Sequence, residues 1–174
     1  MQQARAMPWL WGPLSAVGLG SAGLTLALDQ GSKWWMLEVY GIQDRGVVAV
    51  APFLNLVYVK NRGISYGLFQ LDHQLGQWLL AGFAGVVILV LAVWLARGIT
   101  SKLVAASVGL IMGGAVGNAI DRLLLGGVAD FFQIHAFGYH WYVFNVADAA
   151  IVAGVAGLLY DSLKLSRNRA AKSP

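Results

Sequence analysis

The most regular feature of this chain is a series of long stretches without a charged residue. No charge occurs from Ala6 to Leu28, from Gln74 to Ala96 or from Leu103 to Ile120. A fourth, predominantly apolar segment extends from about Val143 to Leu163 and carries Asp148 near its start. Because about 20 apolar residues span a bilayer as a helix, the pattern predicts four transmembrane helices, at about residues 13–36, 74–96, 103–123 and 143–163.

The region between the first two segments has a different texture. From Leu37 to Asp72 it is rich in Val, Tyr and Phe, is broken by Pro and Gly, and lacks a helical period. Such a composition is typical of short strands and turns. We therefore expect a mainly α-helical membrane protein with a single integral membrane domain over residues 1–174 and a small β-rich region at about 37–72, outside the membrane.

Composition narrows the class of protein. The 174 residues are 58% hydrophobic and only 11% charged, whereas soluble domains carry roughly 25% charged residues. This balance excludes a water-soluble globular domain. The chain has no cysteine, which also excludes disulfides, thiol catalysis and thiolate metal sites.

Basic residues predict the orientation of the helices. They concentrate on the side that holds both termini and the turn between the second and third helices: Arg5, Arg97, Lys102, Lys164, Arg167, Arg169 and Lys172. By the positive-inside rule this side is cytoplasmic. The ends of helices one and three and the starts of helices two and four then meet at the outer face.

Ionisable residues inside apolar segments are candidates for function, because charges in a membrane are costly. Asp29 and Lys33 lie four residues apart on one helix face and can form an ion pair. One interpretation is that this pair neutralises itself near the interface. The alternative is that it orients the active-site side of the bundle.

Helices three and four each present an amide and a carboxylate three residues apart: Asn118 with Asp121, and Asn145 with Asp148. If helix four begins at Val143, Asp148 lies ~8 Å into it. Two carboxylates held close together cannot both ionise, so one keeps a proton. The ionised one can activate water while the other hydrogen-bonds a carbonyl, which is the chemistry of amide hydrolysis without a covalent intermediate.

The partner of Asp148 is chosen from the neighbours of each carboxylate. Asp121 is followed at once by Arg122 and is expected to form an ion pair with it. Asp130 follows a Gly-Gly pair on a connection that can swing toward the fourth helix. We therefore pair Asp130 with Asp148. The alternative without catalysis is that these charges only neutralise one another to hold the bundle together.

Three other motifs are interpreted without a catalytic role. Glycines at 109, 113 and 117 predict close helix packing, since small residues at this spacing let helices approach in lipid. Residues 63–67 match G-x-S-x-G, but that nucleophile elbow requires an α/β sheet. His135 and His140 do not have the spacing of the H-E-x-x-H zinc motif and are expected at the interface. We predict neither a metal nor another cofactor.

Several sequence motifs together resemble one known family. They are DQGSK at 29–33, NRGISYG at 61–67, GGAVGNAIDR at 113–122, GGVADF at 126–131 and FNVADAA at 144–150. In order and over most of the chain, they resemble the lipoprotein signal peptidases, the bacterial signal peptidase II family of intramembrane aspartic proteases. The second motif departs from the usual N-T-G-A-A-F-S form, although Asn61 and Gly63 remain.

The resemblance implies a four-helix domain of the bacterial cytoplasmic (inner) membrane with a small extracytoplasmic β-structured cradle between helices one and two. It implies cleavage of prolipoproteins just before a cysteine that carries diacylglycerol. The partners would be lipidated prolipoproteins and membrane lipid, without nucleic acid. The family's catalytic aspartates fall on Asp130 and Asp148. Its substrate-binding or site-supporting positions fall on Asp29, Lys33, Asn61, Gly63, Asn118, Asp121, Arg122 and Asn145.

Two functions of other classes use the same residues. A small proton-coupled transporter requires polar residues along a path across the membrane, and the middle and inner parts of these helices are apolar. A non-enzymatic lipoprotein-binding protein would leave the second carboxylate without a role. Both interpretations are therefore ranked below the hydrolase.

Overall fold

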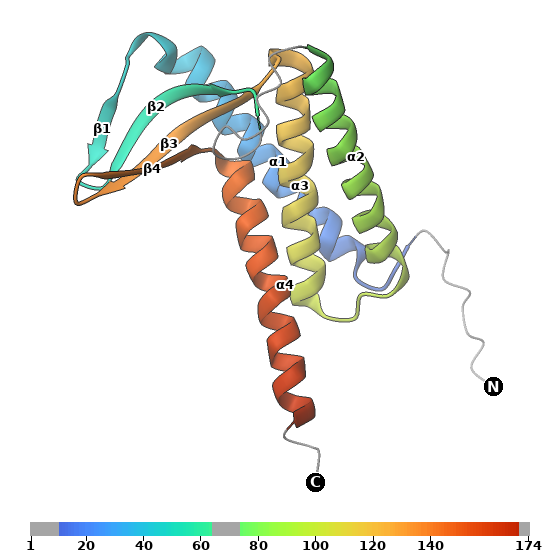
Figure 1. Cartoon of the computed structure of the whole chain (residues 1–174). Helices are drawn as coiled ribbons and strands as arrows, with labels where there is room; N and C mark the ends of the chain where they lie inside the picture. Colours follow the sequence, from blue (N-terminus) through green and yellow to red (C-terminus); the bar gives the residue numbers. More distant parts are fainter. Residues whose placement is uncertain (1–10, 64–73, 171–174) are drawn as a thin grey trace, which may run out of the picture.

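The computed structural model describes residues 11–63 and 74–170, with side chains as far as Ser166. Within these ranges the chain forms four long helices and a four-stranded sheet (Figure 1). The sheet extends from one end of the helix bundle, and the chain enters the first helix and leaves the last at the other end. Except for Gly63, the G-x-S-x-G sequence falls outside the described residues.

The long helices are α1 (Ser15–Trp34), α2 (Gln74–Arg97), α3 (Lys102–Leu125) and α4 (Val146–Ala170). α1 continues as a π-helical turn over Trp35–Val39, which the sequence pattern does not indicate. α3 has clear ends: the Ser101 hydroxyl accepts the Val104 N–H, and Gly126 takes a left-handed conformation with φ +68°. Both features are preferred helix boundaries.

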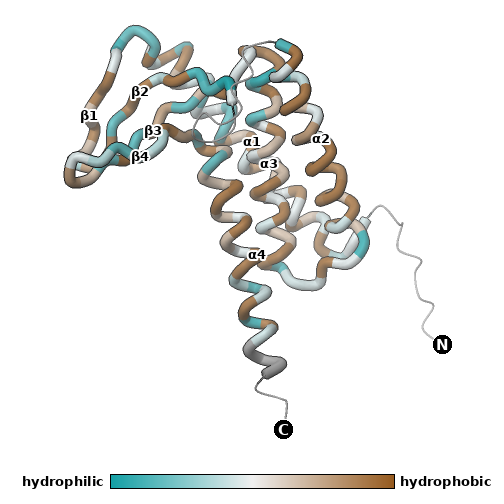
Figure 2. The backbone as a smooth tube through the Cα atoms, in the orientation of Figure 1, coloured by the Kyte–Doolittle hydropathy of each residue, from teal (hydrophilic) through white to brown (hydrophobic). Residues whose placement is uncertain are grey.

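Three of these helices are long and apolar enough to cross a membrane: α2, α3 and residues Val146–Ser166 of α4. Among the described residues, α1 does not meet that criterion; it is rich in Gly and Ser and carries Asp29 and Lys33. Half of the apolar window of α3 is buried, against 6% of that of α2. α3 is therefore the central helix. α2, which Figure 2 colours hydrophobic along most of its length, leaves most of its apolar residues unburied.

Glycines allow α1 to lie directly against α3. A β-carbon on Gly109 would collide with the carbonyl oxygen of Gly18, and Gly113 makes a similar approach to α1. Further along α3, a β-carbon on Gly117 would collide with the carboxylate of Asp29. The structure confirms the packing role predicted for these glycines.

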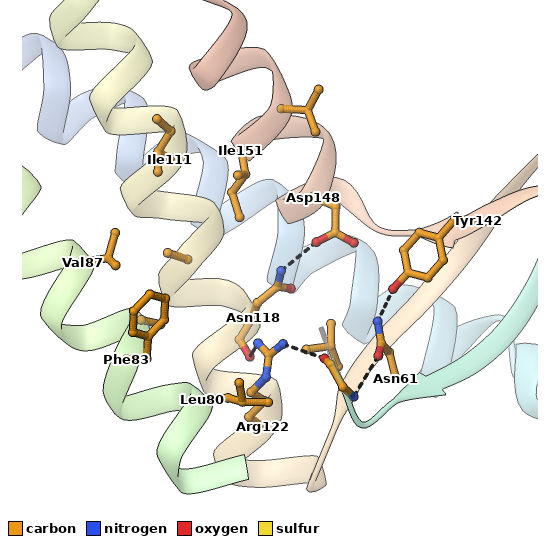
Figure 3. A pocket seen from close by; sticks show the side chains of 15 residues that line it. Asn61, Leu80, Phe83, Val87, Ile111, Asn118, Arg122, Tyr142, Asp148 and Ile151 are labelled. Carbon is orange, nitrogen blue, oxygen red and sulfur yellow. Dashed lines mark hydrogen bonds between the residues drawn. The ribbon is translucent and has the colours of Figure 1, made fainter. Parts of the chain in front are cut away.

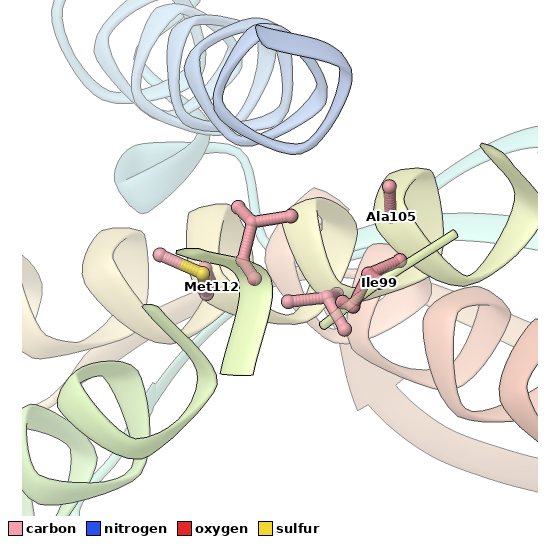
Figure 4. Close-up of a cluster of buried hydrophobic side chains, with 5 residues drawn as sticks. Ile99, Ala105 and Met112 are labelled. Carbon is pink, nitrogen blue, oxygen red and sulfur yellow. The ribbon is translucent and has the colours of Figure 1, made fainter. Parts of the chain in front are cut away.

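Apolar side chains fill the part of the bundle remote from the sheet. The buried cluster comprises Leu95, Ile99, Ala105, Val108 and Met112 (Figure 4). The first two come from α2 and the turn after it, and the other three come from α3. Close packing of such side chains contributes to helix association in membranes through van der Waals contact.

The sheet is antiparallel in the order β1 (Val48–Ala51), β2 (Leu54–Asn61), β3 (Val128–Ala136) and β4 (Tyr139–Phe144). Buried Ala129 and Phe131 of β3 pack against Met36 and Ile42, which follow α1. This contact fixes one face of the sheet to the segment that leaves the first helix.

The predicted β-rich region contains β1 and β2, but only this half of the sheet lies between helices one and two. β3 and β4 come from residues 128–144, which the sequence pattern assigns to a connection and to the start of helix four. They pair across a tight turn in which Phe137 and Gly138 have φ angles of 51° and 82°. Such a turn matches the twist of two adjacent antiparallel strands, so the connection folds back on itself as a hairpin.

Candidate active site

Asp130 lies in β3, and its side chain is fully buried. Asn145 Nδ2 donates to one carboxylate oxygen at 2.6 Å, and Asn61 Nδ2 donates to the other at 3.1 Å. The Tyr142 hydroxyl on β4 accepts a hydrogen bond from Asn61 and lies 3.5 Å from the second oxygen of Asp130. The expectation of a swinging connection is therefore wrong, because strand pairing with β2 holds Asp130 in place.

Asp148 occupies the first turn of α4, because this helix begins at Val146 rather than Val143. The predicted depth within the helix is therefore wrong. Asn145 Oδ1 accepts the Asp148 N–H at 2.9 Å, and the Asn145 N–H donates to the Asp148 carboxylate at 3.4 Å. This reciprocal pair is a capping box, which satisfies N–H groups at a helix start. Asn118 Nδ2 on α3 also donates to Asp148, at 2.9 Å.

Asn145 links the two carboxylates. Its side-chain amide binds Asp130, its backbone N–H binds Asp148, and its Nδ2 lies 3.2 Å from Asn118 Oδ1. Only 1% of Asn145 is exposed. Asp130 and Asp148 therefore belong to one hydrogen-bonded cluster where β3 and the start of α4 meet α3.

The electrostatics of this cluster differ from those of a surface carboxylate. Burial, together with the nearby charge of Asp148, raises the pKa of Asp130 to about 7. Hydrogen bonds from Asn61 and Asn145 oppose the increase. Burial, followed by the charge of Asp130, also raises the pKa of the Tyr142 hydroxyl. A carboxyl group with a pKa near neutrality can hold or release a proton during a reaction.

A buried lysine lies beneath this cluster. Lys33 Nζ is 2.7 Å from Asp29 Oδ2 and 2.8 Å from Asp121 Oδ2, and it donates to Asn118 Oδ1 at 3.3 Å. The structure thus contains the predicted Asp29–Lys33 ion pair. All three ion-pair partners are at most 3% exposed, so the pair does not lie at a solvated surface.

The predicted Asp121–Arg122 ion pair is wrong. Asp121 faces Lys33, whereas the Arg122 guanidinium donates to the backbone oxygens of Asn118 at 3.1 Å and Gly63 at 3.3 Å. Consecutive residues on a helix point about 100° apart, so Asp121 and Arg122 face different neighbours. Arg122 ties α3 to the segment that follows β2, because Gly63 lies two residues beyond the end of that strand.

Two cavities reach Asp148. One, of about 340 Å³, lies between α2, α3 and α4; it is walled by Leu80, Phe83, Val87 and Ile111 and has Asn118, Arg122 and Asp148 at its polar end (Figure 3). The second, of about 540 Å³, lies between α4 and β4 and has an apolar lining of Ile134, Trp141, Phe144 and Val152. Asp148 and Tyr142 line both cavities, so two apolar spaces converge on one carboxylate.

Comparison with known proteins assigns this arrangement to a family. The family described as signal peptidase (SPase) II matches residues 21–164. The chain belongs to the signal peptidase II family. A lipoprotein signal peptidase of Methylobacterium sp. (strain 4-46) is 52% identical over 91% of this chain and 96% of its own length. One from Methylocella silvestris is 53% identical over 84% of this chain and 85% of its own length.

Solved structures agree with the fold. A bacterial membrane enzyme superposes with a TM-score of 0.76 at 26% identity, over 91% of this chain and 94% of the other. A second bacterial membrane enzyme gives a TM-score of 0.71 at 27% identity. This member of the signal peptidase II family is thus a membrane protease, and a transporter function is not supported.

In this family member, hydrogen bonds and ion pairs connect all of the catalytic and site-supporting residues predicted from the sequence. They form one network: Asp29, Lys33, Asn61, Gly63, Asn118, Asp121, Arg122, Asp130, Asn145 and Asp148. Two further members of the network were not predicted from the sequence. Gln30 donates to Asp121 at 3.0 Å and to Asp29 at 3.2 Å, and it lies inside the DQGSK motif. Tyr142 has no local signal, because only the pairing of β4 brings it to the site.

Proposed function

We propose that this chain is an aspartic endopeptidase that removes the signal peptide from diacylglyceryl-modified prolipoproteins by cleaving before the lipidated cysteine. The observation that carries the proposal is the Asp130–Asn145–Asp148 cluster at the convergence of two apolar cavities. Acid and base are adjacent, and a lipid-bearing peptide requires apolar surroundings on more than one side. The names of the relatives supply the prolipoprotein substrate.

The reaction follows from one shared proton. The ionised carboxylate removes a proton from water, and the resulting hydroxide attacks the carbonyl carbon before the cysteine. The protonated carboxyl group hydrogen-bonds the carbonyl oxygen and donates its proton as negative charge develops there. When the C–N bond breaks, the first carboxyl group gives its proton to the leaving amine. The second group, now a carboxylate, takes its proton back from a hydroxyl of the tetrahedral intermediate, so both groups return to their starting states. Water is consumed, and one acid and one amine are released.

We assign the resting proton to Asp130. It is the more buried of the two carboxyl groups, and its pKa is raised to about 7. Asp148 is only half-buried and lines both cavities, which suits the group that activates water. A non-enzymatic lipoprotein-binding protein would not require this difference between two linked carboxyl groups.

We further propose that the sheet end of the bundle faces outward across the inner membrane, with both termini cytoplasmic. The support is the excess of basic residues at the opposite end. Single cysteines at Thr100 and Gln43 are informative, because the protein has no cysteine of its own. In intact cells an impermeant thiol reagent should label the cysteine at 43 and not the one at 100. The reverse pattern would invert the orientation.

The test of activity uses the purified protein in detergent with a diacylglyceryl-modified prolipoprotein. The expected product is the precursor shortened by its signal peptide, detected as a mass shift. The matched control is the same precursor without diacylglycerol, which should be cleaved far more slowly. Absence of cleavage of the lipidated precursor by a folded, monodisperse protein would refute the proposal.

A further inference from the structure

Two backbone N–H groups next to the aspartate pair are held by buried carboxylates. The N–H of Ala129, which immediately precedes Asp130, donates to Asp121 Oδ2 at 3.1 Å. The N–H of Ala147, which immediately precedes Asp148, donates to Asp29 Oδ1 at 2.9 Å. The same relation therefore occurs at both candidate catalytic residues, although one lies on a strand and the other on a helix.

One cation joins these two carboxylates. Lys33 Nζ binds Asp29 Oδ2 at 2.7 Å and Asp121 Oδ2 at 2.8 Å. Gln30 bridges the same carboxylates through its amide. A continuous path thus runs from Ala147 through Asp29, Lys33 and Asp121 to Ala129, and it ties α4 to β3 through the interior of the bundle.

We propose that Asp29, Lys33 and Asp121 form a positioning unit that sets the separation and alignment of Asp130 and Asp148. The inference rests on the proposed peptidase function and adds a role to residues that do not touch the substrate. Misplacement by about 1 Å can reduce a reaction rate by about 100-fold. Fixing the backbone directly before each aspartate is an efficient way to prevent such misplacement.

A purely stabilising role explains less of the geometry. Neutralising Lys33 requires one carboxylate, yet two converge on it. Buried ion pairs are also weak sources of stability, because desolvation offsets much of the Coulombic attraction. The two N–H groups belong to the segments that carry the candidate catalytic aspartates. Ala147 is 118 residues from its acceptor Asp29, and Ala129 is 8 residues from its acceptor Asp121.

Gly117 offers a way to disturb the unit without deleting any of its groups. A β-carbon at Gly117 would collide with the Asp29 carboxylate, whereas one at Gly109 would collide with the backbone of Gly18 on the same pair of helices. Both Gly→Ala changes strain the α1–α3 contact. Only the change at position 117 displaces the positioning unit.

The experiment compares kcat and KM of the purified full-length chain, measured by mass shift and normalised to the folded fraction. Asp121→Leu removes the acceptor for Ala129 and should lower kcat about 100-fold with KM changed by less than about threefold. Asp121→Asn keeps an oxygen for that N–H and should restore kcat to within about tenfold of the parent. Gly117→Ala should lower kcat, while Gly109→Ala should lower stability and leave kcat of the folded fraction unchanged.

The proposal is overturned if folded Asp121→Leu keeps the parental kcat, or if Gly117→Ala and Gly109→Ala reduce stability alike and kcat not at all. If Asp121→Leu does not fold, the comparison of kcat between Gly117→Ala and Gly109→Ala still tests the proposal. Failure of the parent protein to cleave the precursor is a separate result, which contradicts the proposed function itself.

Discussion

The two ends of the helix bundle are held together by different kinds of contact. Remote from the sheet, Leu95, Val108 and Met112 belong to a buried apolar cluster. These side chains come from α2 and α3. Beside the sheet, the α1–α3 interface instead buries Asp29 and Lys33, which are 0% and 3% exposed. The central helix α3 therefore changes from apolar packing at one end to ionic packing at the other.

The charged groups that are removed from solvent are therefore concentrated at the end of the bundle beside the sheet. Apolar side chains of similar volume in place of a buried ion pair are often neutral or stabilising, and α3 packs against α2 with apolar side chains at the other end of the bundle. The ionic end is therefore better explained by the geometry it imposes on Asp130 and Asp148. Variants at the two ends should accordingly separate activity from stability.

The largest effect is expected at the aspartate pair. Either Asp130→Asn or Asp148→Asn should lower kcat by about 10³-fold or more, because each removes a titratable proton from one reaction. Both variants should remain folded and still bind the lipidated precursor, which a pull-down on immobilised precursor can measure.

The double variant provides the control for this prediction. Because the two groups act as one unit, it should be about as inactive as either single variant. If Asp130→Asn cleaves normally while Asp121→Asn is inactive, the pair is Asp121 with Asp148, and the assigned partner is wrong.

The next effect concerns pH. With the pKa of Asp130 raised to about 7, kcat should fall by up to about tenfold per pH unit above that value as the acid loses its proton. It should also fall at low pH as the base becomes protonated, so the profile is bell-shaped and belongs to the pair. Variants of the apolar end should keep the same profile; a shifted profile there would contradict the separation of the two ends.

Stability should depend on pH with a defined sign. Between pH ~4 and ~7 the folded protein retains a proton on Asp130 that the unfolded chain has lost. The free energy of unfolding should therefore decrease as pH rises through this window, by at most about 1.4 kcal/mol per unit. Asp130→Asn should remove this slope, which denaturation in detergent at several pH values can measure.

A smaller effect on activity, but a clear one on stability, is expected at the apolar end. Leu95→Ala should lower the free energy of unfolding by about 2–5 kcal/mol, the usual cost of a cavity at a buried leucine. Leu95 is 2% exposed. The kcat of the Leu95→Ala variant per folded molecule should equal that of the parent. A loss above tenfold would show that the two ends are coupled.

The smallest effect is expected from Ser101→Ala. The Ser101 hydroxyl accepts the Val104 N–H at 3.4 Å and donates to Asp161 on α4 at 2.9 Å. Loss of such a helix cap costs about 1 kcal/mol. Thermal unfolding should detect this change, and cleavage should be unaffected within about twofold; a larger loss of cleavage would contradict a structural role confined to this end.

Several features of the fold could be predicted because their causes are local. The long uncharged segments 74–96 and 103–120 indicate helices in which side chains face lipid, and α2 and α3 occupy these regions. The four-residue spacing of Asp29 and Lys33 determines that they share a helix face, and the ion pair follows. The family motifs predict the residues of the candidate site, but not the contacts between them.

Other features depend on segments that are distant in sequence. The hairpin of β3 and β4 forms because β2 offers it a paired strand, so the connection was not expected to contain strands. Asp121 forms its ion pair with Lys33 and not, as had been predicted, with Arg122. The direction of a side chain on α3 depends on which face of that helix meets α1.

The sequence by itself determined the membrane class and the approximate helical segments, and it led to the prediction of Asp130 and Asp148 as the catalytic pair, because hydrophobic runs, spacing and motifs are properties of a single chain. Only the tertiary structure decided how these groups are connected. Asn145 contacts both aspartates, and Asp29 and Asp121 hold the N–H groups of Ala147 and Ala129. These contacts require a helix start, a strand and two helix faces to meet in three dimensions, and no pattern along one segment encodes that meeting.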